Sequence, residues 1–269
     1  MDNSSIFDQL LYTTLRIECF DDNGIATSIG TGFLLDRPVG EDAYKMYLIS
    51  NKHVLMKTDA IAITFNSGQN GEVVPQQVLR VPIKNLKGNV TGHPNPNVDV
   101  AALDCTGLFL AINDQLYYKK VSYNMLADFN EPELNSAESI YFVGYPENRF
   151  DYVNNLPLIR TGIIASNPKA DFNGIPEFII DAQVFPGSSG SPVFIDLTFE
   201  DIKNGHMVLG GQRKVKLLGI VAATMIRDNK LQVLETADDE KKGIKETIGL
   251  GIVFKAPLIK ELIDSMPTD

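Results

Sequence analysis

A short serine-rich segment, PGSSGSP at residues 186–192, contains the strongest candidate for a nucleophile in this sequence. Its middle serine, Ser189, lies between Gly187 and Gly190. A serine hydroxyl is a poor nucleophile at neutral pH, so it needs an imidazole to accept its proton and a carboxylate to orient that imidazole. The developing oxyanion needs backbone N–H donors, which a glycine turn beside the nucleophile can present.

The candidate bases are few, because the chain has only three histidines: His53, His93 and His206. His53 ends a predicted apolar strand at residues 44–54, whereas the other two lie in turn-rich or polar segments. Asp99 begins the apolar run DVAAL, at the mouth of a predicted buried strand. Taken singly, each of these residues has an ordinary structural explanation. Together, in the chain order His53, Asp99, Ser189, they predict acyl transfer through a covalent intermediate.

Other catalytic chemistries have no support in the motifs of this chain. It has no H-E-x-x-H, paired C-x-x-C, P-loop or G-x-G-x-x-G pattern, so we expect no metal, no cofactor and no nucleotide. In α/β-hydrolases the chain order is Ser, Asp, His, and a helix follows the serine. Here the order is the reverse, and the apolar strand-like run PVFI follows the serine segment.

Composition and charge limit the class of protein further. Of the 269 residues, 44% are hydrophobic and 22% are charged, as in a globular chain, and the formal net charge is −10. A nucleic-acid-binding protein usually has a basic face, so we expect no nucleic-acid partner. No apolar run approaches the roughly 18 residues that span a bilayer, and the start of the chain lacks a basic signal-peptide region. We therefore expect no membrane association.

The two cysteines, Cys19 and Cys105, lie far apart in the sequence and outside any C-x-x-C pattern. A secreted enzyme of this size more often carries several disulfide pairs. The sequence therefore predicts a cytoplasmic protein whose reduced thiols pack as small hydrophobic groups.

The hydrophobic pattern predicts mostly β structure. Short segments with apolar alternation follow one another along the chain, separated by turn signals such as DDNG at residues 21–24. Many short strands of this kind indicate barrels or sandwiches. Helices are expected near the two ends, at residues 3–13 and 257–266. More polar stretches, which we interpret as connections and surface insertions, lie at 106–137, 146–157, 198–214 and 227–246.

Several of these segments resemble one known family, the chymotrypsin-fold serine peptidases. GTGFLL followed by YLISNKHV resembles the strands that lead to the family's catalytic histidine. NVDVAALD resembles the segment that carries its aspartate, and IIDAQVFPGSSGSPVF resembles its serine segment. LLGIVAAT and IGLGIVF resemble its last two barrel strands. The chain is most similar to the single-chain bacterial branch that includes the high-temperature-requirement proteases and the glutamyl endopeptidases.

The resemblance implies an all-β fold of two six-stranded antiparallel β-barrels with a short N-terminal helix and a C-terminal helix. Within one peptidase domain over residues 1–269, we expect an N-terminal barrel at 14–110, an inter-barrel connection at 111–137, a C-terminal barrel at 138–256 and a helix at 257–266. The triad would lie in the cleft between the barrels. Asp99 is preferred over Asp104 because it begins DVAAL. The oxyanion hole is implied at the backbone amides of Gly187 and Ser189.

The resemblance also implies a pocket for the side chain that precedes the scissile bond. Its floor falls at Gln183, where enzymes that cleave after Lys or Arg carry Asp, and Val221 stands where glutamyl endopeptidases carry His. Small neutral walls are expected at Ala222, Ala223, Gly249 and Gly251. Because a buried charge without a counter-charge is costly, we expect a serine endopeptidase that cleaves proteins or peptides after small or medium uncharged residues.

Several positions depart from the animal members of the family. Ser188 stands where they carry the Asp that pairs with a new N-terminus, and no Arg-Ile-Val-Gly-Gly activation site precedes the first strand. Ser191 replaces the usual glycine, as in the glutamyl endopeptidases. No cysteine follows His53, and no PDZ-like segment follows the last helix, so neither the histidine-loop disulfide nor a peptide-gated oligomer is expected. Latency could still arise if the peptide between Pro186 and Gly187 flipped and withdrew one oxyanion donor.

Two other functions remain open at the level of the sequence. A catalytically silent trypsin-fold binding scaffold would keep the barrels without turnover, and an esterase or acyl transferase would use the same acyl-enzyme chemistry.

Bacterial cytoplasmic members of the family can serve as proteolytic effectors beside other proteins. An operon-encoded partner protein of unknown identity is therefore also compatible with the resemblance.

Overall fold

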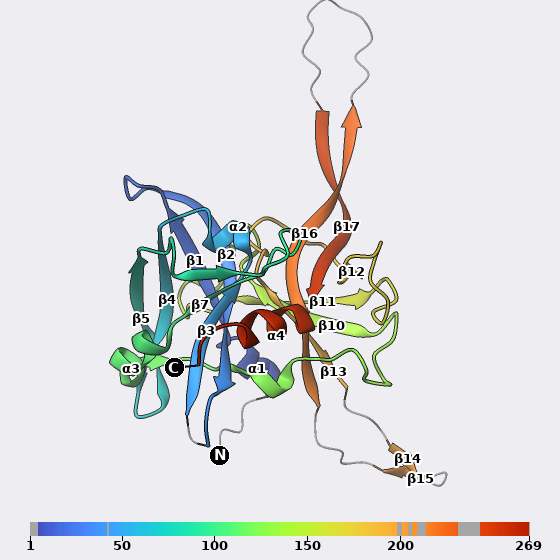
Figure 1. Cartoon of the computed structure of the whole chain (residues 1–269), viewed down its shortest axis with the longest axis horizontal. Coiled ribbons are helices and arrows are strands. Elements are labelled where there is room, and N and C mark those ends of the chain that lie inside the picture. Colours follow the sequence, from blue (N-terminus) through green and yellow to red (C-terminus); the bar gives the residue numbers. More distant parts are fainter. Residues whose placement is uncertain are drawn as a thin grey trace, which may run out of the picture.

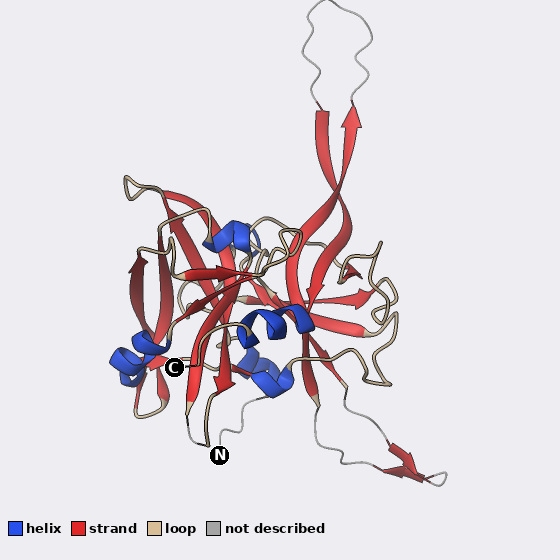
Figure 2. Ribbon diagram, in the orientation of Figure 1, coloured by secondary structure: helices blue, strands red, loops and turns tan. Residues whose placement is uncertain are grey.

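The computed structural model describes residues 5–41, 43–197, 201–203, 206–208, 214–230 and 243–268. Figure 1 shows two β-sheet halves side by side, one built from the blue and green part of the chain and one from the yellow to red part. Helix α4 (Ala256–Asp264) lies between the halves and contacts strands of both. Strands make up far more of the described fold than helices do (Figure 2).

The N-terminal half is a nine-stranded sheet with the order β5-β4-β1-β2-β3-β7-β6, in which β8 pairs with β4 and β9 with β2. Its strands are β1 (Thr14–Phe20), β2 (Ala26–Pro38), β3 (Tyr44–Ser50), β4 (Ala60–Gln69), β5 (Glu72–Lys84), β6 (Val90–Gly92), β7 (Ala101–Asp104), β8 (Leu116–Tyr117) and β9 (Val121–Ser122). The predicted turn joins β1 to β2, and Asp21 Oδ1 accepts hydrogen bonds from the backbone N–H groups of Asn23 and Ile25.

The C-terminal half is a closed six-stranded barrel in the order β10-β11-β12-β17-β16-β13, and all of its pairings are antiparallel. Its strands are β10 (Ser139–Gly144), β11 (Leu158–Ile164), β12 (Glu177–Asp181), β13 (Pro192–Asp196), β16 (Val215–Lys230) and β17 (Gly243–Lys255). A separate hairpin joins β14 (Asp201–Lys203) to β15 (His206–Val208). Beyond the barrel, β16 and β17 continue as a paired arm that projects from the body (Figure 1).

The remaining helices are short: α1 (Ile6–Leu10), α2 (Lys52–Leu55) and α3 (Thr106–Ile112), with single turns η1 (Asn113–Gln115), η2 (Tyr123–Met125) and η3 (Pro146–Asn148). A capping box formed by Ser5 and Asp8 begins α1. Pro257 lies in the first turn of α4, where its missing N–H costs no hydrogen bond. The expected helices near the two ends are therefore present.

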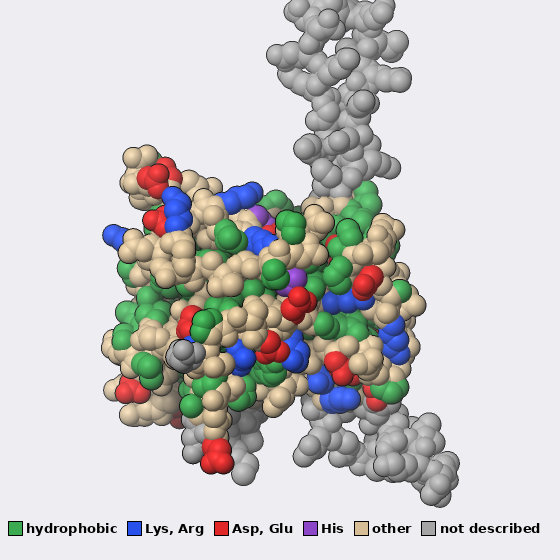
Figure 3. Space-filling view, in the orientation of Figure 1, with side chains coloured by type: hydrophobic (Ala, Val, Ile, Leu, Met, Phe, Trp, Pro, Cys, Tyr) green, Lys and Arg blue, Asp and Glu red, His purple; other side chains and the backbone are tan. Residues whose placement is uncertain are grey.

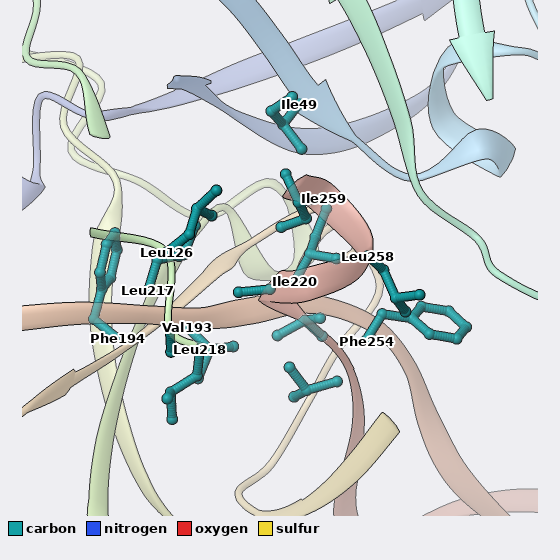
Figure 4. Close-up of a cluster of buried hydrophobic side chains, with 14 of the residues drawn as sticks. Ile49, Leu126, Val193, Phe194, Leu217, Leu218, Ile220, Phe254, Leu258 and Ile259 are labelled. Carbon is teal, nitrogen blue, oxygen red and sulfur yellow. The ribbon is translucent and has the colours of Figure 1, made fainter. Parts of the chain in front are cut away.

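The two halves share a hydrophobic core that runs through α4. Figure 4 shows Ile259 of α4 facing Ile49 of β3 in the first half, close to Ile220 of β16 in the barrel. All three side chains are fully buried, and they belong to one continuous cluster. A second cluster fills the N-terminal sheet alone. Burial of this shared core holds the two halves in a fixed relation to each other.

The predicted all-β class, with a six-stranded barrel and helices near the ends, is confirmed. The first sheet holds nine strands rather than six, partly because β8 and β9 arise from the stretch 106–137 that we interpreted as a connection. The stretch 227–246 was also expected to be a connection, but residues 227–230 pair with 243–246. Residues 231–242 lie outside the described part of the chain, as do 198–200, 204–205 and 209–213 of the insertion 198–214.

The described surface mixes charges of both signs. On the face in Figure 3, Lys and Arg side chains are interspersed with Asp and Glu. Among the described residues, no helix combines the length and apolar character needed to cross a membrane.

Candidate active site

The structure brings His53 and Asp99 into direct contact. The distance between His53 Nδ1 and Asp99 Oδ2 is 2.5 Å, and the backbone N–H of His53 donates to Asp99 Oδ1 at 3.0 Å. Both oxygens of one carboxylate thus bind one residue, which fixes the imidazole plane and leaves Nε2 on the outer edge of the ring. The two side chains retain 36% and 30% of their accessible surface, so a substrate can reach them.

A short helix, rather than the end of a strand, carries His53. Strand β3 ends at Ser50, and Asn51 O accepts from the backbone N–H groups of Val54 and Leu55, which turns the chain into α2. The predicted strand over 44–54 is therefore too long. In this helix, His53 contacts Asp99 in the loop before β7.

Two side chains of the histidine segment bind backbone carbonyls of that loop. Asn51 Nδ2 donates to Asp99 O at 2.6 Å, and Lys52 Nζ donates to Asn95 O at 2.9 Å. Asp99 precedes β7 and does not lie within it. The alternative acid, Asp104, is at the other end of β7, where it caps Thr106 N. Of these two aspartates, the structure places only Asp99 beside His53.

The serine segment forms a tight turn that requires two glycines. Gly187 and Gly190 have φ angles of 88° and 91°, in the left-handed region that favours glycine. A Cβ on Gly190 would lie 1.8 Å from Thr31 O, so the close approach of two backbone segments excludes any side chain there. Within the turn, Ser188 N donates to Phe185 O and Gly190 N donates to Val221 O.

Two N–H groups of this turn are left without an acceptor among the described residues, those of Gly187 and Ser189. They are the two amides that the family resemblance assigned to the oxyanion hole. Their own peptide carbonyls are engaged on the opposite side, because Pro186 O accepts from Glu147 N at 2.6 Å and Ser188 O accepts from Ser191 N at 3.0 Å. In a trans peptide the N–H points away from the C=O, so both donors face away from these anchors. The Pro186–Gly187 peptide thus has one defined orientation.

Ser189 is tied to the half of the molecule that carries His53. Its carbonyl accepts from Thr31 N at 2.9 Å, and Thr31 O accepts from Ser50 Oγ at 2.7 Å, three residues before His53. The Ser189 hydroxyl lies 3.5 Å from Ala222 O, and no hydrogen bond joins it to His53 within the described part of the chain. Nucleophile–base hydrogen bonds are often long or badly aligned in ligand-free enzymes and shorten in the substrate complex.

The residues expected around the substrate lie in three different settings. Val221 is fully buried, and its backbone N donates to Ser191 O. Ala222 lies at a bulge of β16 without a partner in β17, and Ala223 is exposed beside it. Gln183 is also exposed. A Cβ on Gly251 would lie 2.6 Å from Val184 Cγ2, whereas Gly249, with φ of 77°, has open space around it.

Arg160 of β11 was missed by the sequence reasoning. Its guanidinium donates to Gln183 O and lies 5.1 Å from the ring centroid of Phe185 and 5.2 Å from that of Phe142. Partial burial lowers the pKa of this group from its usual value, and no described carboxylate pairs with it. The only signal in the sequence was the alternation of LIRTGII, which places Arg160 on the same face as apolar neighbours.

His93 does not join this site. His93 is buried, its Nδ1 accepts from Asn95 N at 3.2 Å, and its Nε2 lies 3.5 Å from Glu261 Oε2 on α4. It therefore links the loop before β7 to the C-terminal helix. The side chain of His206 lies outside the described residues. Among those described, no group of three His, Cys, Asp or Glu side chains could hold a metal ion. A cavity of about 410 Å³ lies elsewhere, beside α1 and β9.

Comparison with known proteins identifies the family and the fold of this chain. Residues 30–199 match the family model described as the trypsin-like peptidase domain. The active form of the Rv3671c protease from M. tuberculosis is similar in structure, with a TM-score of 0.51 and 17% identity over 99% of this chain and 88% of that one. An inactive form of a serine mutant of Rv3671c from M. tuberculosis H37Rv has a TM-score of 0.48 and 15% identity, over 98% and 93%. At such identities the likeness shows the fold alone. No curated protein matches the sequence.

Proposed function

The chain belongs to the trypsin-like peptidase family and is a serine peptidase, and we propose that its acyl-enzyme forms on Ser189, with His53 as general base and Asp99 as the acid that orients it. The observation that carries this proposal is the contact of both Asp99 oxygens with His53. The Ser189 backbone is tied to the same segment, because Thr31 binds both Ser189 and Ser50. These contacts support a base of fixed orientation and a nucleophile whose backbone is tied, through Thr31, to the strand that precedes the base.

The proposed reaction has two steps. Ser189 Oγ attacks the scissile carbonyl carbon while His53 Nε2 accepts its proton, and the oxyanion receives the N–H groups of Gly187 and Ser189. His53 then gives the proton to the leaving amine as the C–N bond breaks. A water molecule, deprotonated by the same nitrogen, releases the acid product and restores Ser189. Asp99 keeps the proton on Nδ1 and stabilises the imidazolium in both steps.

We further propose cleavage after small or medium uncharged residues. The small side chains of Ala222 and Ala223 and the open space around Gly249 support this preference. A basic side chain that entered beside Gln183 would meet the guanidinium of Arg160. An aliphatic site separates two substrates that differ by a methylene by only about 1–3 kcal/mol, so the preference should be broad.

We also propose that the protein works in the cytoplasm. Cys19 and Cys105 are both unpaired and buried, as expected for a chain that folds under reducing conditions.

Gly30 packs against Val54, the residue after His53. A side-chain contact therefore holds the histidine segment against β2.

An activity-based probe gives the direct test of this function. A fluorophosphonate should label the wild-type chain and fail to label Ser189→Ala, because only an activated serine attacks phosphorus. A wild-type chain that is folded but unlabelled would support the silent scaffold instead. Matched peptide amides and esters of one acyl group would then separate a peptidase from an esterase, since an esterase would leave the amide intact.

A further inference from the structure

Thr31 of β2 occupies an unusual position between the two halves of the molecule. It is fully buried, and each of its polar atoms is engaged. Its N–H donates to Ser189 O at 2.9 Å, and its carbonyl accepts from Ser50 Oγ at 2.7 Å. Its hydroxyl donates to Gly187 O at 2.7 Å and accepts from Tyr145 N at 3.3 Å. One residue of the N-terminal sheet thus contacts the nucleophile's peptide, the turn before it, and the end of β10.

We propose that Thr31 is a positioning residue, whose hydroxyl holds the oxyanion-binding turn in the orientation that catalysis needs. The proposal rests on the function proposed above, in which the N–H groups of Gly187 and Ser189 bind the oxyanion. Thr31 itself touches neither substrate nor the reacting atoms. It acts through the Gly187 carbonyl.

Three successive peptides of the turn are each held at their carbonyl oxygen. The carbonyl before Gly187 is held by the backbone of Glu147, and the carbonyl before Ser189 is held by the backbone of Ser191. The peptide between these two, which links Gly187 to Ser188, is held at its oxygen by the Thr31 hydroxyl. Thr31 therefore supplies the one carbonyl anchor among these three that comes from a side chain, and so the one that a substitution can remove.

Gly187 makes this anchor necessary. Without a Cβ, a glycine rotates about φ and ψ more freely than other residues, and here it must keep φ at 88° for its N–H to stay in place. If Gly187 O lost its donor, the Gly187–Ser188 peptide would be held only by the bond from Ser188 N to Phe185 O. This peptide lies between the two peptides that carry the Gly187 and Ser189 N–H groups, so its rotation would change the orientation of these two donors relative to each other. The anchor thus turns a permissive residue into a fixed donor.

The direction of the hydroxyl proton is also determined. Tyr145 N can only donate, so Thr31 Oγ1 accepts from it and directs its own proton to Gly187 O. Valine has the same shape as threonine but can neither donate nor accept here. Serine keeps both functions and loses only a methyl group. The pair Thr31→Val and Thr31→Ser therefore separates hydrogen bonding from packing.

The test is steady-state kinetics on a peptide amide with wild type and these two variants, together with inhibition by a peptide aldehyde of the same sequence. Thr31→Val should lower kcat by about 10- to 100-fold, below the 10²- to 10³-fold that full loss of an oxyanion donor costs, with little change in KM. Binding of the aldehyde, whose adduct carries the oxyanion, should weaken by a similar factor. Thr31→Ser should restore most of kcat and of aldehyde binding.

Two results would overturn the proposal: a wild-type kcat in Thr31→Val, or equal losses in the valine and serine variants, which would indicate packing alone. A rise in KM with kcat unchanged would also contradict it. Thermal unfolding of each variant shows whether it is folded. If Thr31→Val fails to fold, Thr31→Cys retains a weak S–H donor, and its kcat must fall below that of Thr31→Ser. Failure of the proposed function is distinct, because it would show as wild-type activity that Ser189→Ala leaves intact.

Discussion

The two halves of the molecule build their shares of the site in different ways. In the N-terminal sheet, the proton-handling pair is made of side chains, with His53 Nδ1 directly on Asp99 Oδ2. In the C-terminal barrel, the turn around Ser189 is held mainly by backbone hydrogen bonds and by glycines that tolerate no side chain. Side-chain chemistry therefore determines the first part, and backbone shape determines the second.

The two serines beside the nucleophile illustrate this difference. Ser188 and Ser191 are fully buried, yet neither hydroxyl has a hydrogen-bond partner among the residues that the structure describes. Their backbone atoms, by contrast, bind Phe185 O, Ser188 O and Val221 N. Their chemistry as side chains is thus secondary to the shape that they give the turn.

The sharpest test of the comparison is the removal of the nucleophile. Ser189→Ala should lower kcat by roughly 10⁶-fold, because a concerted triad loses nearly all of its advantage when one member is missing. Adding His53→Ala should cost little more, since the losses are far from additive. The measurement is kcat on a peptide amide for the single and double variants.

The neighbouring serines provide matched controls in the same turn. Ser188→Ala and Ser191→Ala remove hydroxyls that have no hydrogen-bond partner in the described part of the chain, so both variants should keep most of the activity. If either of them abolished cleavage while Ser189→Ala spared it, the nucleophile would be assigned to the wrong serine.

The next largest effect is expected in the N-terminal half. Asp99→Asn keeps the volume but exposes an NH₂ group to His53, and it should lower kcat by about 10⁴-fold at neutral pH, because the imidazole then adopts the wrong tautomer. Asp104→Asn, at the far end of β7, is the matched control and should leave kcat unchanged. Equal losses in both variants would indicate damage to the strand and not to the pair.

A smaller effect is expected in substrate selection. In a peptide library read by mass spectrometry, cleavage after Ala, Val, Leu or Thr should exceed cleavage after Lys or Arg, because the guanidinium of Arg160 beside Gln183 repels a second cation. Arg160→Gln should reduce this discrimination. Dominant cleavage after Lys or Arg in the wild type would refute the proposed preference.

The same peptide library also measures cleavage after residues of the opposite charge, Asp and Glu. Arg160 has no described carboxylate partner, so it is the group that would bind an acidic substrate side chain. Dominant cleavage after Asp or Glu, lost in Arg160→Gln, would replace the uncharged preference by an acidic one. It would leave the roles of Ser189, His53 and Asp99 unchanged.

The sequence was informative where a local pattern has a local cause. Alternating apolar residues indicated the strands, the DDNG segment indicated a turn that Asp21 closes, and the two glycines around Ser189 indicated a tight turn. The last two strands of the barrel were indicated but not their full length, because the sequence IRDNK at 226–230 has no apolar alternation. Likewise β8 and β9 have two residues each, too few for any period to show.

Contacts between distant segments were beyond its reach. The hydroxyl of Thr31 donates a hydrogen bond to Gly187 O, 156 positions further along the chain. The guanidinium of Arg160 donates to Gln183 O, which lies beyond the next strand, β12. Thr31 does not differ in its local pattern from a threonine in any other strand, and the alternation around Arg160 does not indicate which group its guanidinium binds. Only the register of the sheets and the packing of the two halves around α4 bring these groups together.

The smallest effect on activity is expected from modification of the two thiols. They lie in the N-terminal half, whose part of the site is made of side chains, but they take no part in its chemistry. Burial raises the pKa of the Cys105 thiol to about 12 and also raises that of Cys19, whose Sγ donates to Val54 O next to His53. At pH 7 to 8 both groups therefore stay protonated and unreactive.

Iodoacetamide should leave activity unchanged and modify neither cysteine of the native chain, whereas it should modify both in urea. Mass spectrometry counts the modified cysteines in each case. A reductant and a chelator should have no effect either, since the described part of the chain contains free thiols only and no cluster of metal ligands. Rapid loss of activity with alkylation of Cys19 alone would show that the thiol beside the histidine segment is accessible, and that the first half of the site is less closely packed than its contacts indicate.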